Sequence, residues 1–209
     1  IDYFTGTTTQ LDIISELSVE TFPRSESQRR LLLESGTTEY SPTERRMLAP
    51  YINQSWDTGH AAAEWIRGGA TKVKKRQYER LLECAARIRY EFDYRIRYEQ
   101  GLQTPAETLR LHPGPCRDIA ELMIAAARSL DCAARFVTGY VFTPNAAPGS
   151  SSPHAWAEVY LPGAGWKGFD PTLGEMVGTK HIAVAVTHLP ESVPPVAGSF
   201  FGPPGADMQ

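Results

Sequence analysis

Helical and strand patterns occupy separate parts of this 209-residue chain, and their order limits the folds that it can adopt. Apolar residues recur at helical spacing through the middle of the chain, whereas short apolar or alternating segments, separated by turn residues, follow residue 133. Helices followed by neighbouring antiparallel strands predict an α+β fold. The regular strand–helix alternation of a doubly wound sheet is missing from the sequence, as is a glycine-rich phosphate loop.

Three segments carry the strongest helical signals. An Ala-rich stretch runs from Gly59 to Gly68, and the spacing of apolar residues predicts a long amphipathic helix over 72–97. After Gly114-Pro115, a further helix is expected from about Cys116 to Leu130. Its apolar stripe consists of Ile119, Ala120, Met123, Ala127 and Leu130, and the opposite side carries Arg117, Glu121 and Arg128.

The predicted strands follow closely on one another. They are expected at 133–142, His154–Leu161, Trp166–Asp170, His181–Leu189 and Val193–Phe201. Near the start of the chain, the alternation of apolar and polar residues over 17–22 also predicts a strand. Because only a short turn at 161–165 separates two of the later strands, we expect them to form an antiparallel hairpin.

Composition narrows the choice of partners and compartment. Lys and Arg number 21 against 24 Asp and Glu, so the formal net charge of −3 gives no electrostatic case for nucleic acid or an anionic membrane. No apolar run approaches the ~20 residues of a membrane span, and no secretory leader is recognisable at the start. The three cysteines form an odd, sparse set, which favours reduced thiols and a cytoplasmic location over a disulfide scaffold. Because the chain begins with Ile1 rather than Met, we expect a fragment or a processed chain.

Cys116 occupies the predicted first turn of a helix. Unpaired backbone N–H groups and the positive end of the helix dipole surround a sulfur at this position, which favours the nucleophilic thiolate and provides donors for an oxyanion. Taken alone, a cysteine at a helix start is more often a buried packing residue. Cys84 and Cys132 are interpreted as packing residues.

His154 and Asp170 change that balance. Every second residue from Ala155 to Leu161 is apolar, so His154 lies on the opposite face of its strand. The short hairpin places Asp170 opposite His154 or diagonal to it, about 5–8 Å away. Read singly, each of the two is more often structural than catalytic. Together with a cysteine, they fit a nucleophile, a general base and an aspartate that orients the imidazole, the set that performs acyl transfer through a thioester.

Cys116, His154 and Asp170 lie within longer sequence segments that can be compared with known families. They are Gly114–Asp118, Ala133–Tyr140, His154–Tyr160 and Gly165–Thr172, with the shorter Thr104–Glu107 and Val193–Gly198. In order and spacing these segments resemble the bacterial transglutaminase-like superfamily, and the likeness extends over most of residues 72–204. The resemblance implies a papain-like core, a helix bearing the nucleophile packed on an antiparallel sheet, with the triad at Cys116, His154 and Asp170. One departure is Pro115, which stands where the family usually has a small aliphatic residue and which lacks an N–H.

The resemblance also implies a division of the chain and a function. Residues 1–22 are then the last strands of a truncated N-terminal β-domain, 23–71 a connector with short helices, 72–204 the catalytic core and 205–209 a tail. The implied activity is thiol-dependent hydrolysis of a peptide, protein or other amide substrate, with no cofactor. Transglutaminase-type acyl transfer to amines and a non-catalytic interaction module are the alternatives, and the oligomeric state is not predicted.

Two further residues are candidates for contacts with the substrate or its oxyanion. Gln103 lies in the loop that leads towards Cys116. Trp156 shares a strand face with His154, where it would either donate its N–H or shield the imidazole from water.

A zinc site is a competing interpretation of the same region. His112, Cys116, His154 and Asp170 are acceptable zinc ligands, but they lack the close Cys/His pairing of typical structural sites. The remaining histidines, which are His60, His181 and His188, have no suggestive partners in the sequence.

Overall fold

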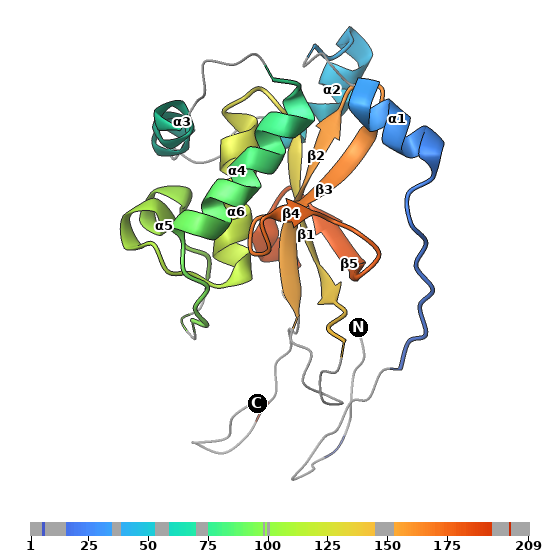
Figure 1. Cartoon of the computed structure of the whole chain (residues 1–209). Coiled ribbons are helices and arrows are strands. Elements are labelled where there is room, and N and C mark those ends of the chain that lie inside the picture. Colours follow the sequence, from blue (N-terminus) through green and yellow to red (C-terminus); the bar gives the residue numbers. More distant parts are fainter. Residues whose placement is uncertain are drawn as a thin grey trace.

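The computed structural model describes residues 6, 16–34, 39–52, 59–69, 75–97, 99, 101–144, 153–193 and 201. Within these ranges helices precede strands along the chain, so the predicted α+β fold is confirmed (Figure 1). The helices are α1 (Glu26–Glu34), α2 (Pro42–Ile52), α3 (Gly59–Gly68), α4 (Gln77–Glu91), α5 (Pro105–Leu111) and α6 (Cys116–Arg128), with a 3₁₀ turn η1 (Pro190–Ser192) after the last strand. None of these described helices combines the length and the apolar character needed to cross a bilayer.

The strands form one antiparallel sheet. They are β1 (Ala134–Val141), β2 (His154–Leu161), β3 (Gly165–Asp170), β4 (Glu175–Met176) and β5 (His181–Thr187), and their spatial order is β4-β3-β2-β1-β5. β2 begins and ends where the alternation of its residues predicts, and β1, β3 and β5 differ from prediction by at most two residues at either end. The two-residue β4 is too short to leave a periodic signal in the sequence.

Helix α6 lies at the centre of the core. It packs on β1 and β2, and α3, α4 and α5 pack against it as well. As a result, every residue of α6 except Arg117 is buried, including the side that carries charged residues. Arg128 on that side donates hydrogen bonds to the backbone oxygens of Tyr51, at 2.9 Å, and Ala134, at 3.0 Å, which offsets the cost of removing its charge from water. The nucleophile candidate therefore stands at the end of the most enclosed element of the fold.

The register of the β2–β3 hairpin decides how His154 and Asp170 relate. Tyr160 pairs with Trp166, and Ala157 pairs with Phe169. One further step along this register sets Asp170 across from Trp156, which makes Asp170 the diagonal neighbour of His154. The predicted hairpin is therefore confirmed, with the diagonal arrangement of the two that the loop length allows.

Helix α4 ends six residues earlier than its apolar spacing predicts. Phe92 already has extended backbone angles, and Tyr94 forms an isolated parallel bridge with Gly114. The N–H of Arg95 donates to the oxygen of Gly114 at 3.0 Å, and the N–H of Gly114 donates to the oxygen of Asp93 at 3.1 Å. Backbone pairing with the segment that enters α6 thus replaces the last helical turn, and it ties this strand-like segment to the start of α6.

The predicted strand at 17–22 is not formed. Residues 16–25 carry no regular secondary structure (Figure 1). Leu17 and Phe22 in this segment are exposed. An alternating segment becomes a strand only where a neighbouring strand accepts and donates its hydrogen bonds, and none of the described strands pairs with it. Residues 1–5, 7–15 and 194–200, where further strands are expected, lie outside the described residues. The assignment of 1–22 to a β-domain therefore stays a prediction.

Gly139 allows a close approach between β1 and β5. The pairing register of these strands shifts between Thr138 and Gly139. A Cβ at Gly139 would overlap the backbone oxygen of Ile182 and stand 2.8 Å from Cη2 of Trp156. Both neighbours are held in place, one by the sheet and the other by full burial, so neither can move aside cheaply.

We expect Gly139→Ala to lower the free energy of unfolding by about 1–3 kcal/mol, the usual cost of overpacking a core. Urea titration followed by circular dichroism measures this change. Gly178→Ala is the matched control, because a Cβ there meets no atom within 4 Å, and its expected effect stays within about 0.5 kcal/mol. Equal stability of the two variants would contradict the packing argument.

Candidate active site

Cys116 is the first residue of α6, as predicted. Pro115 is the N-cap of the helix, and its oxygen accepts hydrogen bonds from the N–H groups of Asp118, at 3.1 Å, and Ile119, at 3.2 Å. The Cys116 side chain is largely buried, with 9% of the residue surface exposed. The sulfur thus lies at the positive end of the helix dipole, where the first backbone N–H groups have no partner within the helix.

His154 and Asp170 are in direct contact. Nε2 of His154 lies 2.8 Å from Oδ2 of Asp170, and the carboxylate is fully buried. The other carboxylate oxygen, Oδ1, accepts hydrogen bonds from the N–H groups of Thr172, at 2.9 Å, and Leu173, at 3.1 Å. Because an ionised carboxylate only accepts, Nε2 of His154 carries the proton in this contact and Nδ1 is the nitrogen left for another partner.

Cys116 is close enough to act on the pKa of this imidazole. Burial alone would lower the pKa of His154, but hydrogen bonds with Asp170 and with the Cys116 side chain, and the charges of both groups, outweigh burial and raise it from 6.5 to about 9. Burial would raise the pKa of Asp170, but the hydrogen bonds from His154 and His181 lower it to about 2. The structure therefore brings the three residues singled out in the sequence into one connected cluster.

His181 also contacts Asp170, although nothing in its sequence neighbourhood indicates this. Its Nε2 lies 3.0 Å from Oδ2 of Asp170, and its side chain is fully buried. His181 opens β5, which is separated from β3 by two other strands in the sheet. The interpretation that His181 has no partner is therefore wrong, because the contact depends on sheet topology that strand patterns alone do not reveal.

Trp156 packs against both histidines. Its ring centroid lies 6.2 Å from that of His154 and 5.3 Å from that of His181, and only 1% of its surface is exposed. Its Nε1 is buried and has no hydrogen-bond partner among the described residues. This geometry favours the shielding role, and a contact with an oxyanion stays a prediction.

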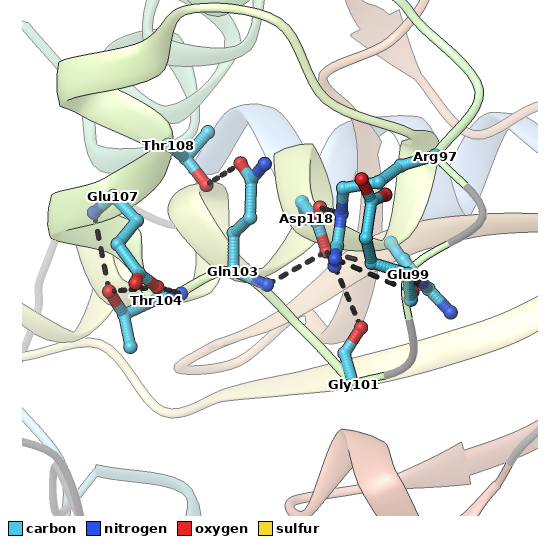
Figure 2. A network of polar contacts seen from close by, with 9 residues as sticks. Arg97, Glu99, Gly101, Gln103, Thr104, Glu107, Thr108 and Asp118 are labelled. Atoms are coloured by element: carbon cyan, nitrogen blue, oxygen red, sulfur yellow. Dashed lines mark hydrogen bonds and ion pairs between the residues drawn. The ribbon is translucent and has the colours of Figure 1, made fainter.

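Gln103 lies in a loop that is hydrogen-bonded to the first turn of α6, as Figure 2 shows. Its N–H donates to Oδ1 of the buried Asp118 at 3.1 Å, and Nε of Arg97 donates to Oδ2 of the same residue at 3.0 Å. The hydroxyl of Thr108 donates to Oε1 of Gln103 at 3.3 Å, which leaves Nε2 as the donor end of the amide. Oε1 would stand 3.6 Å from a Cβ at Gly114, so this side chain lies beside the turn that leads to the cysteine.

Cys84 and Cys132 are buried in the core. Burial raises the pKa of Cys84 to about 12 and that of Cys132 to about 11, the latter despite a hydrogen bond from Gln77. Such thiols are poor nucleophiles at neutral pH. Their prediction as packing residues agrees with their burial in the core.

His112 does not join the cluster around Cys116. Its ring stacks on Phe92 with the centroids 5.1 Å apart, and its Nδ1 lies 3.3 Å from the backbone oxygen of Glu91. In the described part of the chain, no group of three or more His, Cys, Asp or Glu side chains is arranged to hold a metal ion. The contacts of His112 therefore do not support the zinc interpretation.

Comparison with known families agrees with this geometry. Residues 59–171, which include α3 to β3 and all three clustered residues, match the model of the transglutaminase-like superfamily. The chain belongs to this superfamily. The fold, the helix start and the strand positions described above are therefore features of a transglutaminase-like core, as the sequence resemblance implies.

The transglutaminase-like chain also matches individual proteins. It is 33% identical over 138 residues to an uncharacterised protein of Mycobacterium tuberculosis. This match covers 61% of this chain and 44% of that protein. An uncharacterised protein of Mycobacterium leprae is 27% identical over 146 residues, which cover 67% of this chain and 51% of that protein. The chain thus spans about half the length of the curated relatives it matches.

Among solved structures, a candidate cysteine protease from Cytophaga hutchinsonii has a similar fold. The TM-score is 0.57 at 25% identity, and the match covers 77% of this chain and 52% of that one.

The raised pKa of His154 predicts how stability depends on pH. The folded state binds the imidazole proton more tightly than the unfolded state, with a pKa of about 9 against 6.5. The resulting stabilisation is complete below pH 6.5 and is lost as the pH rises through 9. We expect the free energy of unfolding to fall by roughly 1–3 kcal/mol more in the wild type than in His154→Gln between pH 6 and pH 9.5. Urea titrations of both proteins across this range test it, and parallel curves would contradict the tight His154–Asp170 pair.

Proposed function

We propose that this chain hydrolyses amide or peptide bonds through a thioester on Cys116, with His154 and Asp170 completing a catalytic triad. The observation that carries the proposal is the environment of the His154 imidazole: a buried carboxylate holds its Nε2, and a thiol at a helix start is close enough to raise its pKa. This is the arrangement that cysteine nucleophiles require for activation and for protonation of the leaving group.

Each proton and bond has a place in this site. With a pKa of about 9, His154 is an imidazolium at neutral pH, and a cation beside a thiol favours the thiolate. The Cys116 sulfur attacks the carbonyl carbon, which forms the S–C bond and moves the carbonyl electrons to oxygen. The C–N bond then breaks, and the departing amine takes its proton from His154. Water attacks the thioester and gives a proton to His154, and cleavage of the C–S bond releases the acid and restores the thiolate.

The negative oxygen of the intermediate needs hydrogen-bond donors. The N–H of Cys116 stands at the first position of α6, where it has no partner within the helix. Pro115 has no N–H to add. We therefore assign the second donor to Nε2 of Gln103, because Thr108 occupies the oxygen of the same amide and the side chain lies beside Gly114.

Family membership supports this choice of chemistry. The superfamily model covers all three residues of the triad, and the similar Cytophaga structure is described as a candidate cysteine protease. We therefore put hydrolysis first. Acyl transfer from the same thioester to an amine differs only in the final acceptor and is an outcome of the test below.

We expect Cys116→Ala to abolish turnover of a library of amide and peptide substrates, since it removes the nucleophile. In the wild type at pH 7, we expect iodoacetamide to modify Cys116 at least about tenfold faster than Cys84 or Cys132, whose raised pKa values leave almost no thiolate. Mass spectrometry of tryptic peptides measures the three rates. Full turnover in Cys116→Ala, or equal labelling of all three thiols, would eliminate the triad.

Cys84→Ala is the matched control for this experiment. It removes a buried thiol remote from the proposed chemistry and should retain wild-type kcat. The same substrates incubated with and without a primary amine separate the two acceptors. A product that forms only when the amine is present would identify a transferase, and cleavage without it would identify a hydrolase.

We expect Gln103→Glu to lower kcat by about 10²-fold, the usual cost of removing one oxyanion donor. The substitution keeps the shape of the side chain and an oxygen that Thr108 can reach, but it replaces the N–H donor with an acceptor. Alkylation of Cys116 by iodoacetamide should stay within twofold of the wild-type rate, because that reaction forms no oxyanion. A kcat within twofold of wild type would remove Gln103 from the oxyanion site.

A further inference from the structure

Two histidines donate to the same oxygen of one carboxylate. Nε2 of His154 lies 2.8 Å and Nε2 of His181 lies 3.0 Å from Oδ2 of Asp170. The two histidines come from different strands, β2 and β5, and both pack on Trp156. Cys116 acts on the pKa of His154, and the proton transfers proposed above give His181 no part.

The hydrogen bonds of His181 define its tautomer. The N–H of Gly178 donates to Nδ1 of His181 at 3.2 Å, so Nδ1 accepts and carries no proton. The proton therefore resides on Nε2, which faces Asp170. His181 acts on the carboxylate as a neutral donor, without adding a positive charge to the buried cluster.

Removal of His181 need not release the carboxylate. Oδ1 of Asp170 stays anchored by the N–H groups of Thr172 and Leu173, and Oδ2 still faces His154. His181 instead changes how strongly Oδ2 of Asp170 accepts the hydrogen bond from His154. Two donors on one oxygen weaken each other, since each withdraws electron density from the same lone pairs.

We propose that His181 is a positioning residue that acts on His154 through Asp170. By sharing Oδ2, it limits the pull of the carboxylate on the imidazolium, so that His154 can still release its proton to the leaving amine. A general acid works best when its pKa lies near the operating pH. A buried carboxylate that His154 did not share with His181 would make His154 hold its proton too tightly. This inference rests on the proposed function, because it assigns His181 a role in the same triad.

The charged and titratable groups that act on these residues are few. Asp170 of β3 and Cys116 of α6 act on His154, and the two histidines act on Asp170. A change in the proton affinity of His154 after a substitution at His181 is therefore transmitted through Asp170.

Two variants of matched length separate the donor from the bulk of His181. His181→Gln keeps an N–H donor at a similar reach, and His181→Met removes the donor but fills the space. The rate of Cys116 alkylation by iodoacetamide is measured from pH 5 to pH 11 in each variant. In a plot of this rate against pH, the limb at high pH reports deprotonation of His154. The measurement requires no turnover of a substrate.

We expect the upper limb to move upward by about 0.5–1 pH unit in His181→Met and to return to the wild-type position in His181→Gln. With the amide substrate found for the wild type, kcat should fall about tenfold at pH 7 in His181→Met and recover in His181→Gln. His181→Asn, whose shorter amide does not reach Asp170, provides a second donor-free variant if His181→Met does not fold. Thermal unfolding of each variant verifies that the folded protein is measured.

The opposite results overturn the inference. If the upper limb stays in place in His181→Met and His181→Asn, His181 has no influence on the triad. If it moves down towards the ordinary histidine value in His181→Met and in His181→Gln, the role of His181 is purely structural. His154→Ala distinguishes this failure from that of the proposed function. If the limb persists in His154→Ala, the triad itself is wrong, whereas a limb that vanishes there but ignores His181→Met overturns the role of His181 alone.

Discussion

The site depends on one buried negative charge. The Asp170 carboxylate has no exposed surface, so its ionised form exists only because four donors surround it: two imidazoles on Oδ2 and two backbone N–H groups on Oδ1. Leaving a buried charge without its partners costs about 3–5 kcal/mol, a large part of the stability of a domain of this size. The contact that makes burial of the carboxylate tolerable also fixes the position of the His154 imidazole. In this protein, the stability of the sheet end and the geometry of the site have the same cause.

The sheet brings His154 of β2 and His181 of β5 together at the carboxylate of Asp170 on β3. The β2–β3 hairpin makes Asp170 a diagonal neighbour of His154, and the register shift at Gly139 lies where β5 approaches β1 with His181 at its start. Trp156 fills the space against both histidines, and no Cβ at Gly139 competes with it. The register shift and Gly139 therefore contribute to the site, because they allow β5, which carries His181, to approach β1 closely.

Local patterns predict the parts of this structure that local forces determine. The start of α6 at Cys116 follows from Gly114-Pro115 and the stripe after it, and the length of the hairpin loop limits Asp170 to two positions relative to His154. The end of α4 and the contact of His181 could not be predicted in the same way. Backbone pairing with Gly114 ends α4 early, and the position of β5 depends on the order of strands in the sheet. Both depend on tertiary contacts, which the periodicity of the sequence does not reveal. For this reason the contact of His181 with Asp170 could not be predicted.

The burial of α6 has a consequence for the dynamics of the site. Backbone amides open to exchange with solvent in cooperative units, and the most enclosed elements open only when the whole domain unfolds. Since α6 packs against β1, β2, α3, α4 and α5, we expect its amides to belong to the most protected class. We therefore expect the backbone that carries Cys116 to keep its position for as long as the domain remains folded.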